Sequence, residues 1–417
     1  MSLRVRTALL DDDRPLLDLT PLPAETVAWV RKGDGLVGWG TAVRIEPGPG
    51  PDRFLRADAA LRDLASETEV DDPVGAPGTG LVGLGSFTFD AKAAGSVLIV
   101  PRVVVGRHGG VTWITTIDPE GAAPVPGPST TAPRAPIRDR PRFAGSSNPD
   151  LRWLEAVADA AARIRAGELD KVVLARDHAI WSHEPFDPLD LARRLAQRFP
   201  RCHTFVLDGL VGATPELLLR RSGRHVASRV LAGTTGRSDD EVEDAALGAA
   251  LLASDKDRLE HTLAADSVLE VLEPRCTELR HDPEPRLLRL DNVQHLATTF
   301  SGQLRGAERA ETSLEVVAAL HPTAAVGGTP RAEALAVIRA CEGMDRGRYA
   351  APVGWSTPDG DGEWGIALRC AELSGARARL FAGGGIVGAS LPEDELQETR
   401  LKLLAMQAVL DATPPGD

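Results

Sequence analysis

The chain has few of the residues that build disulfide frameworks or zinc sites. Its four cysteines (Cys202, Cys276, Cys341 and Cys370) lie far apart, and none belongs to a CxxC motif or a Cys/His cluster. Scattered cysteines are typical of a reducing compartment, whereas zinc sites need closely spaced Cys and His ligands. We therefore expect free thiols, no zinc site and a cytoplasmic location.

Long apolar runs and an excess of positive charge are also missing. No apolar stretch is long enough to span a bilayer, and the opening residues, MSLRVRTALLDDDRP, contain no signal-peptide run. The net charge of -13 at pH 7 argues against a nucleic-acid or anionic-membrane partner. With 417 residues, 43% of them hydrophobic and 26% charged, the chain is expected to be soluble and to form one large or two ordinary domains.

The sequence divides into two regions. Residues 1–145 contain short apolar strands separated by turn residues, one expected helix at 56–69, and no cluster of catalytic side chains. Residues 120–136 are rich in proline, glycine, serine and threonine, which predicts a loop. From 146 to 417, antiparallel strands alternate irregularly with amphipathic helices. This order favours an α+β fold, with both regions in one unit, over an alternating parallel β/α fold.

A short segment near the end of the chain, residues 363–404, concentrates polar groups. Trp364, Ile366 and Leu368 alternate with small residues, which predicts a strand that carries Arg369 on its opposite face. A second strand at 378–382 runs into a predicted loop, 383–385, whose three glycines leave the backbone amides uncovered. Ser390 and Glu393 fit the capping box of a following helix.

On that helix, Glu395, Glu398 and Lys402 are spaced to share one face. Together with an arginine and bare amides, two carboxylates and a lysine suit an anionic ligand and a hard divalent cation. The alternative is an ordinary solvated, self-paired helix face. A third interpretation is a dinucleotide site, because Gly383, Gly385 and Gly388 match GxGxxG, but that site needs a βαβ array with a later acidic residue, and the chain ends too soon.

Three further residues could carry proton transfer or bind a cation. Lys171 opens an apolar strand, so burial could lower its pKa and make it a base; the alternative is a strand-end lysine that reaches solvent. Glu216 follows an expected tight turn at 212–215 and precedes an apolar run, so it is a candidate acid or a surface glutamate. Glu260 lies on the apolar face of a helix and needs a partner, either a metal shared with Glu395 or Glu398, or an arginine.

Other candidates are weaker when taken alone. His295 stands in an apolar strand, where a hydrogen-bonded core histidine is the default. Gly233-Thr234 and residues 327–329 are loop positions that could present amides to a carboxylate or only turn the chain.

Taken together, these stretches resemble the chorismate-utilising enzymes, and most of all the isochorismate synthases. The resemblance covers about residues 148–417 in order, and the first region matches only as the variable N-terminal part of that family. The matching stretches are KVVLARD (171–177), ATPELLL (213–219), LAGTTGR (231–237), ASDKDRLEH (253–261), VQHLAT (293–298), LHPTAAVGGTP (320–330), GWSTPDGDGEWGIALRCAEL (354–373), LFAGGGIVGAS (380–390) and ETRLK (398–402).

The resemblance implies a fold and a set of roles. The fold would be a single α+β unit with two large antiparallel sheets packed together and helices outside, in which 146–417 binds chorismate. Lys171 would activate water, and Glu216 would protonate the departing hydroxyl. Glu260 and Glu398, with Glu395 nearby, would hold Mg²⁺. The resemblance also implies that the substrate contacts Gly233, Thr234, His295, Ala325, Tyr349, Arg369, Gly383, Gly384, Gly385 and Lys402.

Three positions separate the sibling reactions that the resemblance suggests. Aminodeoxychorismate synthases carry a lysine nucleophile where this chain has Ala232. Anthranilate synthases lack a lysine at the position of Lys171, and salicylate synthases usually have threonine where this chain has Ala325. All three positions here favour an isochorismate synthase.

We therefore expect a Mg²⁺-dependent isomerase that adds water at C2 of chorismate and removes the C4 hydroxyl. It would feed menaquinone or siderophore biosynthesis, and it would act as a monomer without a glutaminase subunit. The nearest alternative is a salicylate synthase, which adds a pyruvate-lyase step. An alternative of another class, a non-catalytic ligand-binding protein, would be favoured if Lys171 or Glu216 were missing, and both are present.

Overall fold

The computed structural model describes residues 3–129, 141–306 and 309–411 of the 417-residue chain. Its helices are α1 (Arg53–Ser66), α2 (Asp150–Arg165), α3 (Pro188–Arg198), α4 (Glu241–Ala253), α5 (Asp255–Leu272), α6 (Ser313–Leu320), α7 (Arg331–Cys341) and α8 (Pro392–Leu410), with short 3₁₀ turns η1 (Leu16–Asp18) and η2 (Pro23–Glu25). None of these described helices is long and apolar enough to cross a membrane.

The strands alternate with these helices irregularly along the chain. They are β1 (Leu3–Leu9), β2 (Val27–Arg31), β3 (Asp34–Ile45), β4 (Thr68–Asp71), β5 (Gly83–Ser86), β6 (Val97–His108), β7 (Val111–Pro119), β8 (Arg142–Gly145), β9 (Lys171–Trp181), β10 (His203–Leu207), β11 (Leu210–Thr214), β12 (Leu217–Ser222), β13 (His225–Gly236), β14 (Cys276–His281), β15 (Arg286–Arg289), β16 (Val293–Leu304), β17 (Gly328–Thr329), β18 (Pro352–Ser356), β19 (Gly362–Ile366), β20 (Cys370–Ser374) and β21 (Arg377–Ile386).

These strands form one hydrogen-bonded sheet that branches at β6. β3 pairs with β6 along one edge, while β5 and β7 share its other edge. From β3, one arm runs through β2, β10, β11, β20 and β21 to β9. From β5, the other arm runs through β18, β19, β12 and β13 to β16. Among the described pairings only β1–β4 is parallel, so both arms are antiparallel sheets.

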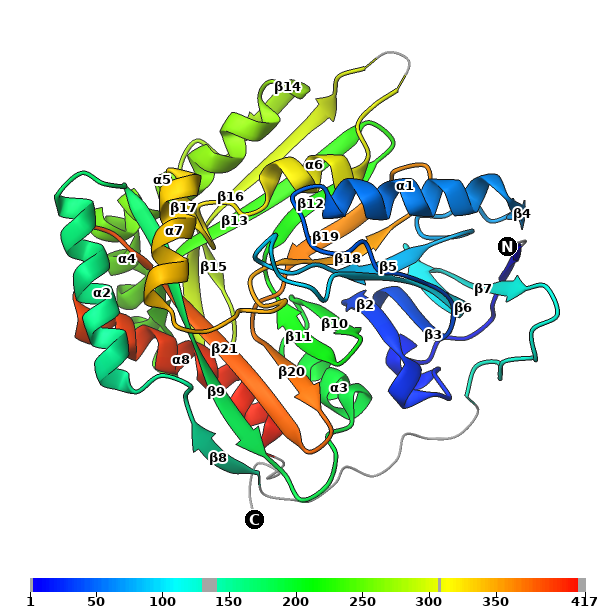
Figure 1. Ribbon diagram of the computed structural model, residues 1–417, viewed down its shortest axis with the longest axis horizontal. Coiled ribbons are helices and arrows are strands. Elements are labelled where there is room, and N and C mark those ends of the chain that lie inside the picture. Colours follow the sequence, from blue (N-terminus) through cyan, green and yellow to red (C-terminus); the bar gives the residue numbers. More distant parts are fainter. Residues whose placement is uncertain (1–2, 130–140, 307–308, 412–417) are drawn as a thin grey trace.

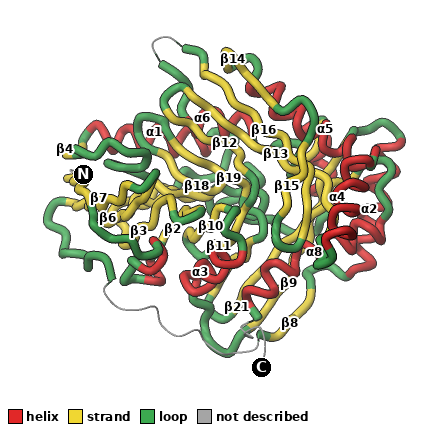
Figure 2. The backbone as a smooth tube through the Cα atoms, turned by 180° about the vertical axis from the view of Figure 1, so that it is seen from behind, coloured by secondary structure: helices red, strands yellow, loops and turns green. Residues whose placement is uncertain are grey.

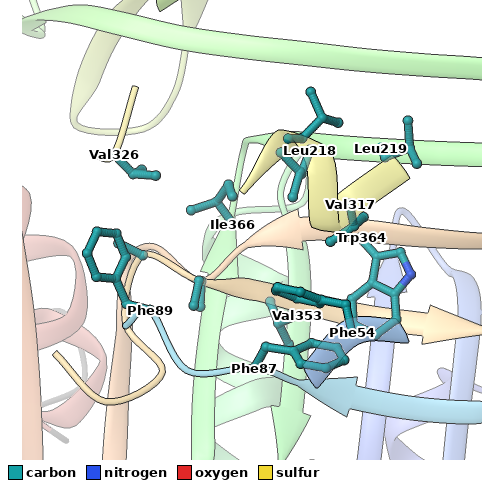
Figure 3. Packing of buried hydrophobic residues seen from close by; sticks show 14 of the residues in the cluster. Phe54, Phe87, Phe89, Leu218, Leu219, Val317, Val326, Val353, Trp364 and Ile366 are labelled. Atoms are coloured by element: carbon teal, nitrogen blue, oxygen red, sulfur yellow. The ribbon is translucent and has the colours of Figure 1, made fainter. Parts of the chain in front are cut away.

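The two arms face each other across a buried interior. Trp29 of β2 donates its indole N–H to Glu363 of β19 at 2.8 Å, and His203 of β10 reaches the same carboxylate at 2.8 Å. Figure 3 shows part of the apolar cluster, in which Phe54, Phe87 and Trp364 pack together. Burying such large side chains supplies most of the favourable free energy of folding.

The helices lie outside the sheets. In Figures 1 and 2, α2, α4, α5 and α8 gather at one end of the molecule, and Figure 1 shows α7 beside them. There α8 packs along β21, and α5 packs along β13. At the other end α1 packs beside α6. The two antiparallel arms of this sheet, with helices outside them, confirm the predicted α+β fold. The division of the chain at residue 145 stays a prediction, although strands of both regions share the sheet.

Three local expectations near the site are wrong. The expected glycine loop at 383–385 is the end of strand β21, hydrogen-bonded along β9. Arg369 lies between β19 and β20 with a φ of 45°, so strand alternation does not set its direction. The expected Ser390–Glu393 capping box is absent, because α8 has Leu391 as its N-cap without a side-chain bond and Ser390 accepts from Val387 instead.

The predicted loop at 120–136 can be assessed only in part. The structure describes no helix or strand within residues 120–129, as expected, and the remaining part of the predicted loop lies outside the described residues.

Candidate active site

Most of the predicted site residues line one pocket between the two arms, where β9, β13 and β21 run past α5 and α8. Its empty space is about 690 Å³, open mouth included. The predicted residues on its wall are Glu216, Gly233, Thr234, Glu260, His295, Ala325, Tyr349, Arg369, Gly383, Gly385 and Lys402. The other four, Lys171, Gly384, Glu395 and Glu398, are not among the lining residues, although Lys171 lies next to Gly385 and Glu395 next to Gly384.

Gly383 and Gly385 present bare backbone to the pocket. Their partners in β9, Ala175 and Val173, donate their N–H groups elsewhere, to Glu342 Oε1 and Gly327 O, each at 2.8 Å. In an antiparallel pair such residues turn their peptide groups away from the partner strand. The amides of the two glycines therefore face away from β9.

Glu260 reaches the pocket from α5 and meets Lys171 of β9. The Lys171 ammonium lies 3.3 Å from Glu260 Oε1 and donates to the Glu260 carbonyl at 3.2 Å. The Lys171 side chain is 0% exposed. Burial lowers its pKa from the usual value, and the negative charge of Glu260 opposes that shift. The sequence predicted a metal or an arginine beside Glu260. The charged side chain that the structure places there is Lys171, a lysine that can act as a base.

Glu395 and Glu398 project from the start of α8, each beside a lysine. Lys402 bonds Glu398 at 2.5 Å and the Gly383 carbonyl at 2.9 Å. Lys256 of α5 bonds Glu395 Oε1 at 2.6 Å. The Glu395 side chain is only 1% exposed, and burial together with the charge of Glu398 raises its pKa to about 7. This helix face is therefore mostly buried instead of solvated, although Lys402 and Glu398 do pair with each other within the helix.

These carboxylates fit a hard cation. The Glu395 Oε2 atom is buried and has no hydrogen-bond partner in the described part of the chain. It points at Gly384, where an added Cβ would lie 2.9 Å away, and a Cβ on Gly385 would overlap Glu260 Oε1. No three acidic, His or Cys side chains of the described ranges converge tightly enough to enclose an ion alone. A hexacoordinate cation such as Mg²⁺ would take its other ligands from water and substrate.

Glu216 lies between β11 and β12 and is buried. The tight turn expected at 212–215 is wrong, because residues 212–214 belong to β11. The Glu216 amide donates to Thr214 Oγ1 at 3.2 Å. Burial raises the pKa of the Glu216 carboxyl to about 8, against the positive charges of Lys171 and Arg229. At neutral pH the carboxyl is therefore protonated and able to donate a proton.

Arg369 is buried and donates to a histidine instead of a carboxylate. Its Nη2 lies 3.0 Å from His295 Nε2, and His295 Nδ1 lies 3.0 Å from Thr234 Oγ1. Because a guanidinium only donates, His295 Nε2 must accept, so the ring proton sits on Nδ1 and points to Thr234. Burial and the charge of Arg369 hold the pKa of His295 well below its usual value. Within the described residues no carboxylate pairs with Arg369, which leaves its charge for an anionic ligand.

Sequence reasoning missed three contributors to the site. Phe381 and Arg346 line the pocket; Phe381 stacks on Tyr349 at 5.0 Å, and Arg346 donates to Val326 O at 2.8 Å and pairs with Glu342. Lys256 stands four residues before Glu260, so helical spacing could have placed both near the same face. Nothing local in the sequence marks Phe381 or Arg346.

Comparison with known proteins places the chain in a family. Residues 130–411 match the family described as "Chorismate binding enzyme". The chain therefore belongs to the chorismate-binding enzymes.

Individual relatives narrow the similarity. The "Salicylate biosynthesis isochorismate synthase" of Pseudomonas aeruginosa is 37% identical over 92% of this chain and 84% of its own length. "Isochorismate synthase DhbC" of Bacillus subtilis is 42% identical over 61% of this chain and 66% of its own length, just under two thirds. The solved structure of MenF, the menaquinone-specific isochorismate synthase of Escherichia coli, superposes with a TM-score of 0.80 at 25% identity, covering 98% of this chain and 94% of MenF.

Proposed function

We propose that this chain is an isochorismate synthase, an isomerase that converts chorismate to isochorismate. The observation that carries the proposal is the pair of oppositely shifted groups at one pocket. Lys171 has a lowered pKa and can accept a proton, while Glu216, with a pKa of about 8, holds one at neutral pH. Both shifts favour the neutral form near neutral pH, which leaves the lysine able to accept a proton and the glutamic acid able to donate one.

In the proposed reaction Lys171 takes a proton from water while the water oxygen bonds to C2 of the ring. The ring double bonds shift, the C4–oxygen bond breaks, and Glu216 gives its proton to the departing hydroxyl. One water enters and one leaves, so the reaction is a net isomerisation. Lys171 and Glu216 each influence the other's pKa, which supports their placement around one small ring.

Substrate binding would use the cationic and amide groups of the pocket. Chorismate is a dicarboxylate, and Arg369, Lys402 and the amides of the strand end 383–385 offer charge-assisted hydrogen bonds. Mg²⁺, held by Glu260, Glu395 and Glu398, would supply positive charge for a substrate carboxylate. Gly233, Thr234, His295, Ala325 and Tyr349 would form the remaining walls.

Two small residues support water as the nucleophile. Ala232 and Ala325 both line the pocket. Ala232 brings no amine that could compete with water for C2, and Ala325 leaves space beside the ring. The product would therefore be isochorismate, with little of the pyruvate elimination that a salicylate synthase adds.

The metabolic pathway is proposed from similarity to other proteins and not from the geometry of the pocket. Solved structures described as a menaquinone-specific and as a 2,3-dihydroxybenzoate-specific isochorismate synthase both match this chain, and its isochorismate would enter menaquinone or siderophore biosynthesis. We propose that the chain acts in the cytoplasm as a monomer. We also propose that it needs no glutaminase subunit, because a reaction in which Lys171 activates water uses no ammonia.

The proposal is tested by incubating the purified chain with chorismate and Mg²⁺ or with EDTA, then separating the products. Isochorismate should form with Mg²⁺, fail to form in EDTA and return when Mg²⁺ is restored. Glu260→Gln should remove activity while the circular dichroism spectrum stays unchanged. Full turnover in EDTA would remove the metal from the account, and no turnover of chorismate under any condition would overturn the function.

A further inference from the structure

Three lysine–glutamate ion pairs lie at the pocket wall or next to it. The chain contains only five lysines among its 47 Lys and Arg residues. Three of the five, Lys171, Lys256 and Lys402, each pair with one of the three glutamates described above. A chain that uses arginine almost everywhere else thus places compact point charges here.

The three lysines differ in how freely they can leave their partners. The Lys171 side chain is 0% exposed and also bonds a backbone carbonyl. Lys402 is held twice, by Glu398 and by the Gly383 carbonyl. Lys256 is 27% exposed, and among the described residues Glu395 is the only hydrogen-bond partner of its ammonium group. Only Lys256 can therefore move to solvent at the loss of a single bond.

Its partner, Glu395, faces the place where a cation fits. One oxygen, Oε1, accepts from Lys256, while Oε2 is buried without a partner in the described residues and points at Gly384. A divalent cation bound there would repel the ammonium group that lies 2.6 Å from the same carboxylate. Glu395 therefore cannot bind the divalent cation and the Lys256 ammonium group strongly at the same time.

We propose that Lys256 is an internal competitor for the metal, which neutralises Glu395 before Mg²⁺ binds and swings to solvent when it binds. This inference rests on the proposed Mg²⁺ site and goes beyond it. Lys256 keeps a buried carboxylate paired while the pocket holds no cation, and it weakens metal binding in return. Lys256 is not among the residues that line the pocket, so its role is to set the affinity for Mg²⁺.

Because the chain has so few lysines, the movement can be measured on the unaltered protein. An amine-acylating reagent is applied with and without MgCl₂, and each lysine is quantified by peptide mass spectrometry. Mg²⁺ should increase acylation of Lys256 relative to the exposed Lys32, whereas Lys171 should stay unmodified. Unchanged acylation of Lys256 at saturating Mg²⁺ would overturn the proposal.

Calorimetric titration of MgCl₂ into variants provides the second test. Lys256→Met removes the competing charge and should bind Mg²⁺ about fivefold more tightly or better, within the range usual for coupled sites. Lys256→Arg keeps the charge and should bind no more tightly than the unaltered chain. Arg258→Met, on the same helix but paired with Glu284 at the surface, is the matched control and should leave the affinity unchanged.

The outcomes separate this inference from the proposed function. Weaker Mg²⁺ binding by Lys256→Met would show that Lys256 supports the metal site, which contradicts competition but leaves that site intact. Equal tightening by Lys256→Met and Lys256→Arg would assign the effect to packing and overturn the proposal. Absence of any heat of Mg²⁺ binding to the unaltered chain would overturn both the metal site and the role of Lys256.

Discussion

Arg369 donates a hydrogen bond from Nη2 to Nε2 of His295 at 3.0 Å, and through it the histidine is fixed as one neutral tautomer. The ring proton lies on Nδ1 and faces Thr234. The neutral His295 ring thus orients the buried Arg369 guanidinium without cancelling its positive charge, which remains available to an anionic ligand. The sequence marked His295 only as a core histidine or, through the resemblance, as a pocket residue.

Replacing that acceptor should weaken substrate binding more than the chemical step. His295→Phe removes the bond to Arg369, so KM for chorismate should rise about tenfold or more, the loss of a charge-assisted hydrogen bond, while kcat changes less. His295→Gln, which retains an acceptor, should recover part of the affinity. Steady-state kinetics of both variants decide the matter, and a fall in kcat with KM unchanged would contradict a positioning role.

The raised pKa of Glu216 should set the pH above which activity falls. Burial raises its pKa to about 8, so the carboxyl is protonated below that pH and loses its proton above it. If it is the acid, kcat should fall with rising pH through about 8. Glu216→Gln cannot donate a proton and should reduce kcat by about 10²–10⁴. A pH profile that stays flat from 7 to 10 would remove Glu216 from this role.

The same shift has a consequence for stability. The unfolded carboxyl has a pKa near 4.5 and the folded one about 8, so the folded state binds the proton more tightly. Its contribution to stability is complete below pH 4.5 and declines as pH rises to 8. Chemical denaturation should therefore show the unaltered chain losing stability relative to Glu216→Gln across this interval. A constant difference between the two proteins would contradict a buried, protonated Glu216.

Gly385 should tolerate no side chain. A Cβ at this position would overlap Glu260 Oε1 and come within 3.0 Å of the Lys171 side chain. Gly385→Ala should displace both groups and reduce kcat by about 10², the usual effect of a displacement of about 1 Å in an active site. Gly388→Ala is the control, because its Cβ would meet the flexible Arg165 side chain at 3.3 Å. Equal kcat values for Gly385→Ala and Gly388→Ala would show that the space beside Gly385 is not needed for activity.

The sequence predicted the architecture and most pocket positions, but it could not give their local geometry. Glu260 was correctly placed on a buried helix face, because helical spacing is set by the chain itself. Arg369 could not be placed from strand alternation, since β19 ends at Ile366 and Arg369 itself has a positive φ. The three glycines looked like a loop, and only pairing with the distant β9 makes them strand.

Sequence patterns also could not predict pairs of residues that are far apart in the chain. Lys171 and Glu260 are 89 residues apart, and Lys256 and Glu395 are 139 apart. A helical or strand period carries no information about such pairs, so the lysines that neutralise Glu260 and Glu395 became visible only in the folded chain. The resemblance to a family supplied pocket positions such as Tyr349, which no local pattern had marked.

The most direct test of the account is a product time course run from both sides of the reaction. The purified chain with Mg²⁺ is given chorismate in one vessel and isochorismate in another, and all products are separated by chromatography. The account predicts that both vessels approach the same ratio of chorismate to isochorismate, with little salicylate and, when ammonia is added, no anthranilate. Salicylate and pyruvate accumulating in equal amounts from the first minutes would contradict it and identify a salicylate synthase instead.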